Sequence, residues 1–300
     1  MSPSALSLST SGTTLLVTSS ILWGCWSLVC RGAEHASSRP VPAALQTFVV
    51  VAAMAVVLVP LAARERATSS TTRDGSWRWL ALLGLTDALN SLSFFAAMQH
   101  TSVAVAVLCH YAAPLLVARA APLLLRERRV KGTAGALMLA VVGVVLVLRP
   151  WVAVDHDDVV GAGLGLLSAV FYAASVLIGK RLVGHRGNVE VAGWPKLVSL
   201  PVIALAVVAG GVVVDVEPLP LAILVGGGVV CGALPLLLFY AGLRRLPASQ
   251  ASVLTLVEPV TAVAIGVVVL REPLTWSVAV GGAFVLVGVA LVARTARGGR

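Results

Sequence analysis

The chain contains two related stretches, AAPLLVARAAPLLLRER at residues 112–128 and VEPVTAVAIGVVVLREP at residues 257–273, which lie 145 positions apart. Four aligned groups join residues that are less common in this chain: Pro114 with Pro259, Arg126-Glu127 with Arg271-Glu272, Gly143 with Gly288, and Phe95-Ala96 with Tyr240-Ala241. Matches among Leu, Val and Ala carry little weight in so apolar a sequence. The rarer matches share one register without a gap, and they indicate that the chain arose by internal duplication.

The composition is that of a membrane protein. Of the 300 residues, 58% are hydrophobic and only 12% are charged, and the mean hydropathy is +0.97. Soluble domains are about 45–50% apolar. In such a chain the unit of organisation is the membrane-spanning segment, which needs about 20 apolar residues.

Ten apolar stretches are long enough to be considered as spans, and only helices satisfy their backbone groups in lipid. They are residues 14–30, 41–63, 77–97, 102–125, 132–149, 159–179, 190–211, 218–241, 248–270 and 274–293. The sequence therefore predicts an all-α integral membrane protein with ten transmembrane helices. Each half holds five of them, so the second half enters the membrane from the opposite side, as an inverted-topology repeat. The predicted halves are 14–149 and 159–293, with short tails at 1–13 and 294–300.

The basic residues predict the orientation. If the N-terminus is cytoplasmic, 16 of the 22 Lys and Arg residues fall in inside segments and four fall outside. This bias predicts that both termini face the cytoplasm. It also accounts for the net charge of +9 without a nucleic-acid partner. The first 13 residues carry no Lys or Arg, so we expect the first apolar stretch to be a retained anchor and not a cleaved signal peptide.

The four cysteines lie in apolar stretches with no metal-binding or disulfide spacing, and we interpret them as packing residues.

Two passages resemble one transporter family. They are SVAVAVLCHYAAPLLVARAAPLLLRERRVKGTAGALMLAVVGVVLVL at 102–148 and LRRLPASQASVLTLVEPVTAVAIGVVVLREPLTWSVAVGGAFVLVGVALVA at 243–293. Each resembles the end of a repeat of the EamA type, in the drug/metabolite transporter (DMT) superfamily: a small-residue helix with a central Pro, an acidic junction, and a Gly-punctuated last helix. The resemblance implies a bacterial inner-membrane protein that exports or exchanges small metabolites, often amino acids.

Ionisable side chains inside spans are costly and mark functional candidates. Glu258 and His110 lie near the middle of their stretches, next to Pro259 and Pro114. A Pro inside a helix removes a backbone hydrogen bond and kinks the helix. We predict that Glu258 binds a substrate ammonium group or carries a proton, with hydrogen-bonded packing as the alternative for both side chains. Ala113 occupies the position equivalent to Glu258, so the carboxylate belongs to one half only.

Polar stripes on other helices suggest a shared cavity, although hydroxyl groups also join helices in membranes. The full set of predicted substrate-binding residues is Glu258, His110, Tyr111, Asp87, Asn90, Trp23, Tyr172 and Thr255, with kinks at Pro114 and Pro259.

Other charged residues have structural interpretations. Glu190 and Lys196 lie in the first turns of their stretch, where their polar ends can reach the membrane surface. Arg119 lies about 180° around its helix from His110. We therefore expect its side chain to extend to the membrane surface or to form a structural ion pair, and not to contact the substrate. Glu127 and Glu272 each precede a helix, where a carboxylate is favourable. The glycines of the last helix in each half permit close packing or, alternatively, act as hinges.

These features favour a secondary transporter working by alternating access, with protons as the driving ion where one is used. The alternatives are a membrane-embedded enzyme or lipid-handling protein, and a channel or sensor. No catalytic motif or ATP-binding loop occurs in the sequence, so we expect no enzyme activity, no cofactor and no metal. The expected partners are a small-molecule substrate, the lipid bilayer and protons. The sequence leaves open whether the chain is a monomer or a homodimer.

Overall fold

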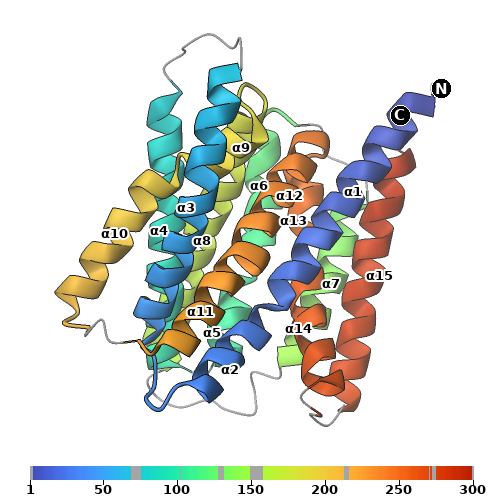
Figure 1. Ribbon diagram of the computed structural model, residues 1–300. Coiled ribbons are helices and arrows are strands. Elements are labelled where there is room, and N and C mark those ends of the chain that lie inside the picture. Colours follow the sequence, from blue (N-terminus) through green and yellow to red (C-terminus); the bar gives the residue numbers. More distant parts are fainter. Residues whose placement is uncertain are drawn as a thin grey trace.

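The computed structural model describes residues 3–68, 76–101, 103–127, 132–148, 158–212, 216–269, 271 and 275–298, and every regular element within them is helical (Figure 1). The helices of the first half are α1 Pro3–Gly24, α2 Trp26–Ala36, α3 Ala43–Thr68, α4 Trp77–His100, α5 Val103–His110, α6 Ala113–Leu124 and α7 Thr133–Leu148. Those of the second half are α8 Asp158–Val183, α9 Asn188–Gly193, α10 Lys196–Ala209, α11 Pro218–Gly227, a π-helical turn Gly228–Ala233, α12 Leu234–Arg245, α13 Ala248–Leu254, α14 Val257–Val268 and α15 Trp276–Gly298.

Eight of these helices, or runs of consecutive helices, are long and apolar enough to cross a membrane. They are Gly12–Ala36, Ala43–Thr68, Trp77–His100, Val105–Leu124, Val159–Val183, Asn188–Ala209, Pro218–Arg245 and Ala248–Val268. Two shorter apolar helices, Thr133–Leu146 and Ala279–Val292, lie within α7 and α15. The predicted class, an all-helical membrane protein, is confirmed.

Several helices extend beyond the apolar runs that predicted them. α3 continues to Thr68, whereas the sequence predicted an end at residue 63, and the added turn contains Arg64, Glu65 and Arg66. A hydropathy pattern marks only the apolar part of a helix. It does not mark a polar turn at the end of the helix, even where hydrogen bonds and ion pairs keep that turn helical. α12 extends in the same way through Arg244 and Arg245.

α7 and α15, the last helices of the two halves, lie side by side (Figure 1), and they pack closely at glycine residues. A Cβ atom added at Gly143 would lie 2.5 Å from the carbonyl oxygen of Gly281, and one added at Gly288 would lie 2.6 Å from that of Ala136. These two contacts exchange under the repeat offset of 145, since Gly143 is equivalent to Gly288 and Ala136 to Gly281. The helices therefore run antiparallel, and each half presents the same surface to the other.

The junction before the last helix of each half has the same backbone shape. Arg126 has a φ of 54° and Arg271 a φ of 57°, and these are the two non-glycine residues with positive φ among the described residues. Both occupy the left-handed region that side chains disfavour. The duplication therefore extends to the conformation of this junction. Their neighbour Glu272 lies outside the described residues, whereas Glu127 accepts hydrogen bonds from the backbone N–H of Ala248.

The two ends of the bundle are tied differently. α1 begins and α15 ends at the same end, where the last turn of α3 and α9 also lie (Figure 1). At the opposite end, Ser38 after α2 donates its hydroxyl and its backbone N–H to Glu217 before α11. These exposed hydrogen bonds lower the pKa of the Glu217 carboxyl.

Candidate functional site

The fourth span of each half is broken in the middle. α5 ends at His110 and α6 begins at Ala113, while α13 ends at Leu254 and α14 begins at Val257. Pro114 lies in the first turn of α6 and Pro259 in the first turn of α14. Neither ring has an N–H to donate to the carbonyl four residues earlier, so the backbone reorganises there.

The two breaks bring polar residues from both halves together around one cavity. It has a volume of about 180 Å³ and is lined by Trp23, Asn90, His110, Tyr111, Ala113, Pro114, Tyr172, Thr255 and Glu258. Seven of the eight predicted substrate-binding residues are in this set, although they come from five different predicted spans. The eighth, Asp87, lines a neighbouring cavity of about 300 Å³ that shares Trp23 and Glu258 with the first. The two cavities therefore meet at these two side chains.

His110 is held by a defined hydrogen bond. Its Nδ1 lies 2.9 Å from the hydroxyl of Ser168, and that hydroxyl donates to the carbonyl of Gly165 at 2.8 Å. A serine has one hydroxyl proton, so while Ser168 donates to Gly165 a neutral imidazole must carry its proton on Nδ1 to make this bond, which leaves Nε2 as an acceptor. The rings of Phe94, Tyr111 and Tyr172 surround the imidazole, with centroids 5.0–5.8 Å away. The arrangement fixes the ring and offers one acceptor atom.

Glu258 is the carboxylate shared by the two cavities. Among the described residues, no cation forms an ion pair with it. The end of α1 approaches α14 closely here, since a Cβ at Gly24 would lie 2.8 Å from the Glu258 carbonyl oxygen. This approach places Trp23, which stacks obliquely on Phe239 at 5.4 Å, beside the carboxylate. A partly buried carboxylate without a protein cation is suited to a proton or a cationic ligand.

The larger cavity holds a charged pair that the sequence interpretation missed. Lys196 Nζ lies 2.6 Å from Asp87 Oδ2, and the Lys196 side chain is 5% exposed while that of Asp87 is 35% exposed. Lys196 therefore does not reach toward the membrane surface as predicted. The helix break at Trp194–Pro195 places it at the start of α10, facing α4. That Pro, immediately before an intramembrane lysine, was the feature that could have revealed the pair.

Gln46 and Thr47 also line this cavity and were missed. They are the polar side chains of an otherwise apolar run from 41 to 63, which is a pattern that could have marked them.

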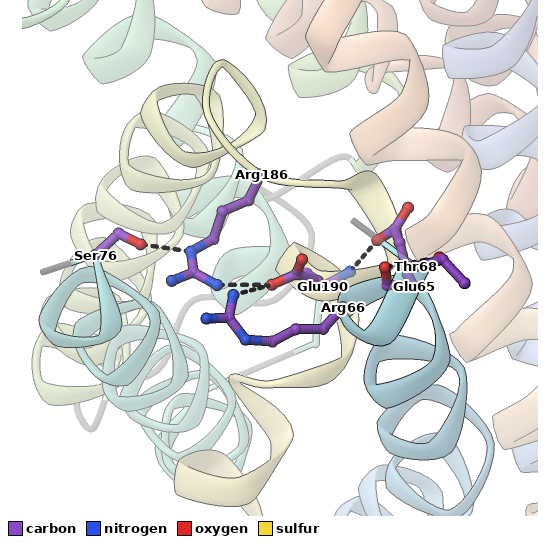
Figure 2. A network of polar contacts seen from close by, with 6 residues as sticks. All are labelled: Glu65, Arg66, Thr68, Ser76, Arg186 and Glu190. Carbon is purple, nitrogen blue, oxygen red and sulfur yellow. Dashed lines mark hydrogen bonds and ion pairs between the residues drawn. The ribbon is translucent and has the colours of Figure 1, made fainter. Parts of the chain in front are cut away.

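Glu190 is also placed differently from its prediction. It is fully buried at the end of the bundle where the termini lie, and its Oε2 accepts from Arg186 at 2.6 Å and from Arg66 at 3.3 Å (Figure 2). Its backbone N–H donates to Glu65 at 2.8 Å, and Arg186 also donates to Ser76. Because two arginines pair with the Glu190 carboxylate, it is stabilised in the interior without contact with water.

We call these five residues the end network. They are Glu65, Arg66, Ser76, Arg186 and Glu190, and they join α3, the start of α4, the turn after α8, and α9 (Figure 2). Both arginines also lie over the Trp77 ring, with guanidinium carbons 5.4 and 5.0 Å from its centroid. The end network therefore fastens helices of both halves together at one end of the bundle.

Arg119 lies apart from both central cavities. It is exposed on α6 and lines a separate groove with Thr133 and Ser249. This placement agrees with the predicted position of Arg119 about 180° around the helix from His110. The described residues hold no cluster of three or more metal-ligating side chains, and all four cysteines are free.

The family model of the EamA-like transporter family matches residues 10–149 and again residues 159–294. The chain belongs to the EamA-like transporter family. The predicted membership of the DMT superfamily is thereby confirmed, as are the two repeats. The family consists of transporters, so the expectation that the chain is not an enzyme is also confirmed.

Relatives of this EamA-like chain are transporters as well. An uncharacterized transporter of Archaeoglobus fulgidus is 31% identical over 71% of this chain and 76% of that protein. The threonine/homoserine exporter RhtA of Salmonella typhimurium is 30% identical over 61% of this chain, and the match spans 59% of RhtA. A protein of known crystal structure has the same fold, with a TM-score of 0.80 over 96% of this chain and 99% of that one, at 21% identity.

Proposed function

We propose that this protein is a secondary transporter that exports or exchanges a small polar metabolite across the plasma membrane by alternating access. The observation that carries the proposal is the position of Glu258, which forms no ion pair among the described residues and is shared by two cavities at the break of α13 and α14. The substrate class we propose is an amino acid, whose ammonium group binds Glu258. The name of the relative RhtA, an exporter of threonine and homoserine, is in keeping with this class.

The charges of the two cavities support recognition of an ammonium group. Asp87 and Lys196 neutralise each other, and Glu258 adds one negative charge. A ligand with one positive group restores neutrality in a site where an unpaired charge is costly. The imidazole of His110 and the amide of Asn90 add hydrogen-bonding groups to the lining of the smaller cavity.

Proton coupling in this proposal also uses Glu258. One carboxylate cannot hold a proton and an ammonium group at the same time, so the two compete for it. Inward movement of a proton then drives outward movement of the substrate.

The proposed alternation depends on the repeats and the end network. The antiparallel packing of α7 and α15 supports an inverted topology, in which each half crosses the membrane in the opposite direction to the other. The end network fastens the end of the bundle that holds the termini, whereas α2 and the first turns of α3, which line the larger cavity, lie at the other end (Figure 1). With both termini in the cytoplasm, this arrangement corresponds to a state closed to the cytoplasm.

The function is tested by flux in proteoliposomes. Labelled amino acids are loaded inside and their release is measured with and without a pH gradient, for the wild type and for Glu258→Gln. We expect the variant to lose flux by about 100-fold, as for a lost charged hydrogen bond, while remaining folded. Glu34→Gln, the same change at an exposed position on α2, is the control and should keep wild-type flux.

Two results would count against parts of this account. Wild-type flux through a well-folded Glu258→Gln protein would remove the carboxylate from the mechanism. Flux that ignores the pH gradient would remove the proton but not the substrate site.

Orientation is tested in a cysteine-free background. Thr68→Cys, at the end of α3, should react with an impermeant maleimide only in permeabilised cells. His35→Cys, near the opposite end of the bundle, should react in intact cells. The reverse pattern would invert the proposed topology.

A further inference from the structure

A groove beside Arg119 is lined by residues that have no part in the proposed transport mechanism. It has a volume of about 440 Å³ and lies between α6, α7 and α13. Its lining is Leu115, Ala118, Arg119, Pro122, Thr133, Ala134, Leu137, Met138 and Ser249, none of which lines the two central cavities. The groove is therefore a separate feature on the side of the bundle.

Arg119 places a positive charge in this groove. It lies five residues before the end of α6, about 7 Å inside the span. Among the described residues, no carboxylate forms an ion pair with it. Arginine at such a depth is stabilised by pairing or by reaching toward the membrane surface. Its guanidinium group binds phosphate in a planar, two-pronged geometry.

Thr133 supplies an independent indication of a ligand. Thr133 lines the groove and is buried, at 5% exposure, and its hydroxyl has no hydrogen-bond partner among the described residues. Thr133 is also the first residue of α7, a helix of 16 residues, so the free N–H groups of this helix lie at the same place. A buried hydroxyl and a helix N-terminus beside an arginine form a binding site for an anion.

The remainder of the groove is apolar and open to the side. Ala134 and Met138 continue along α7 from Thr133, and both are exposed, Met138 at 56%. An inorganic anion would leave this surface uncovered, whereas a hydrocarbon chain would cover it. In addition, four of the six residues from 126 to 131 are basic in the sequence, which favours an anionic membrane surface.

We propose that this groove binds an anionic phospholipid. The lipid phosphate is bound by Arg119 and the Thr133 hydroxyl, and one acyl chain lies along Ala134 and Met138. The site does not depend on which compound the protein transports. The bound lipid would hold α6 and α7 of the first half against α13 of the second half.

The experiment is native mass spectrometry of the full chain released from nanodiscs of equal parts dioleoylphosphatidylglycerol and dioleoylphosphatidylcholine. We expect the wild type to retain phosphatidylglycerol selectively, and Arg119→Gln to weaken this retention by about tenfold. Thr133→Val removes the hydroxyl at nearly constant shape and should weaken it by a smaller factor. Ala134→Phe fills the groove without changing charge and should also reduce retention, because Ala134 is exposed there.

The matched control is Arg64→Gln, which removes a basic residue that is exposed at the end of α3 and outside the groove. It should leave retention unchanged. The proposal is overturned if Arg119→Gln retains as much phosphatidylglycerol as the wild type, or if Arg64→Gln loses as much as Arg119→Gln. Displacement of the lipid by millimolar glycerol 3-phosphate alone would also overturn it, since the acyl chain would then contribute nothing. Ala134→Phe and Thr133→Val keep the test decisive if Arg119→Gln does not fold.

Discussion

The two halves of the molecule are alike where they pack and different where they face the central cavities. Gly143 and Gly288 make equivalent contacts, and Arg126 and Arg271 share an unusual backbone conformation. Around the cavities, Glu258 has Ala113 as its counterpart, and His110 has Thr255. Packing between the halves depends on a geometry that both must keep, whereas one carboxylate is enough to bind one charged group.

The ends of the bundle differ in the same way. The end network has no counterpart in the other half, since the positions equivalent to Glu65, Arg66, Arg186 and Glu190 are Gly210, Gly211, Val41 and Leu45. At the other end, the hydrogen bonds between Ser38 and Glu217 are exposed. The duplication thus accounts for the packing that the two halves share. Residues that differ between the halves form the end network, which fastens one end of the bundle.

The largest expected effect is on the end network. Glu190→Gln removes the buried carboxylate that pairs with Arg186 and with Arg66, and we expect the free energy of unfolding to fall by about 3 kcal/mol. Reversible unfolding in mixed detergent micelles measures this, with Glu34→Gln as the exposed control. A loss no larger than that of the control would mean that the network contributes little to fastening this end.

The packing glycines offer a direct test of symmetry. Gly143→Ala and Gly288→Ala each place a methyl group against a backbone carbonyl, and each should lower the free energy of unfolding by about 2 kcal/mol. The controls lie on the same helices: a Cβ at Gly135 meets nothing within 4 Å, and one at Gly282 meets only Val260, at 4.0 Å. Alanine at either control position should be neutral or stabilising. Unequal losses at Gly143 and Gly288 would show that the two halves do not pack equivalently.

His110 and Thr255 test the asymmetry of the cavity. The Thr255 hydroxyl already donates to the Ser252 carbonyl at 2.7 Å, whereas Nε2 of His110 makes no hydrogen bond to any of the described residues. We therefore expect His110→Phe, which keeps a ring among the aromatic neighbours, to lower flux by about tenfold, and Thr255→Val to change it by about twofold at most. The measurement is the initial rate in proteoliposomes over a range of substrate concentrations. Equal losses at both positions would indicate that the halves contribute alike.

The apolar helices, the two repeats and the helix breaks could be predicted from the sequence. They depend on local composition and on single residues such as Pro114 and Pro259. It also predicted that Glu258 and His110 would be near mid-membrane, and both line the same cavity. It placed Lys196 and Glu190 wrongly for a common reason. Their partners, Asp87, Arg66 and Arg186, lie on other helices, and the position of a charge along its own helix does not reveal a partner across the bundle.

The smallest expected effect concerns the junctions at Arg126 and Arg271. Each side chain is held in the left-handed region at a cost of about 1 kcal/mol, which glycine would not incur. We expect Arg126→Gly and Arg271→Gly each to raise the free energy of unfolding by up to about that amount. Arg294→Gly, the same substitution inside helix α15, should lower it by a similar amount, because glycine disfavours helix. If the two junction variants were destabilised like the helical one, the arginine side chains would be stabilising the junctions through contacts that outweigh the strain.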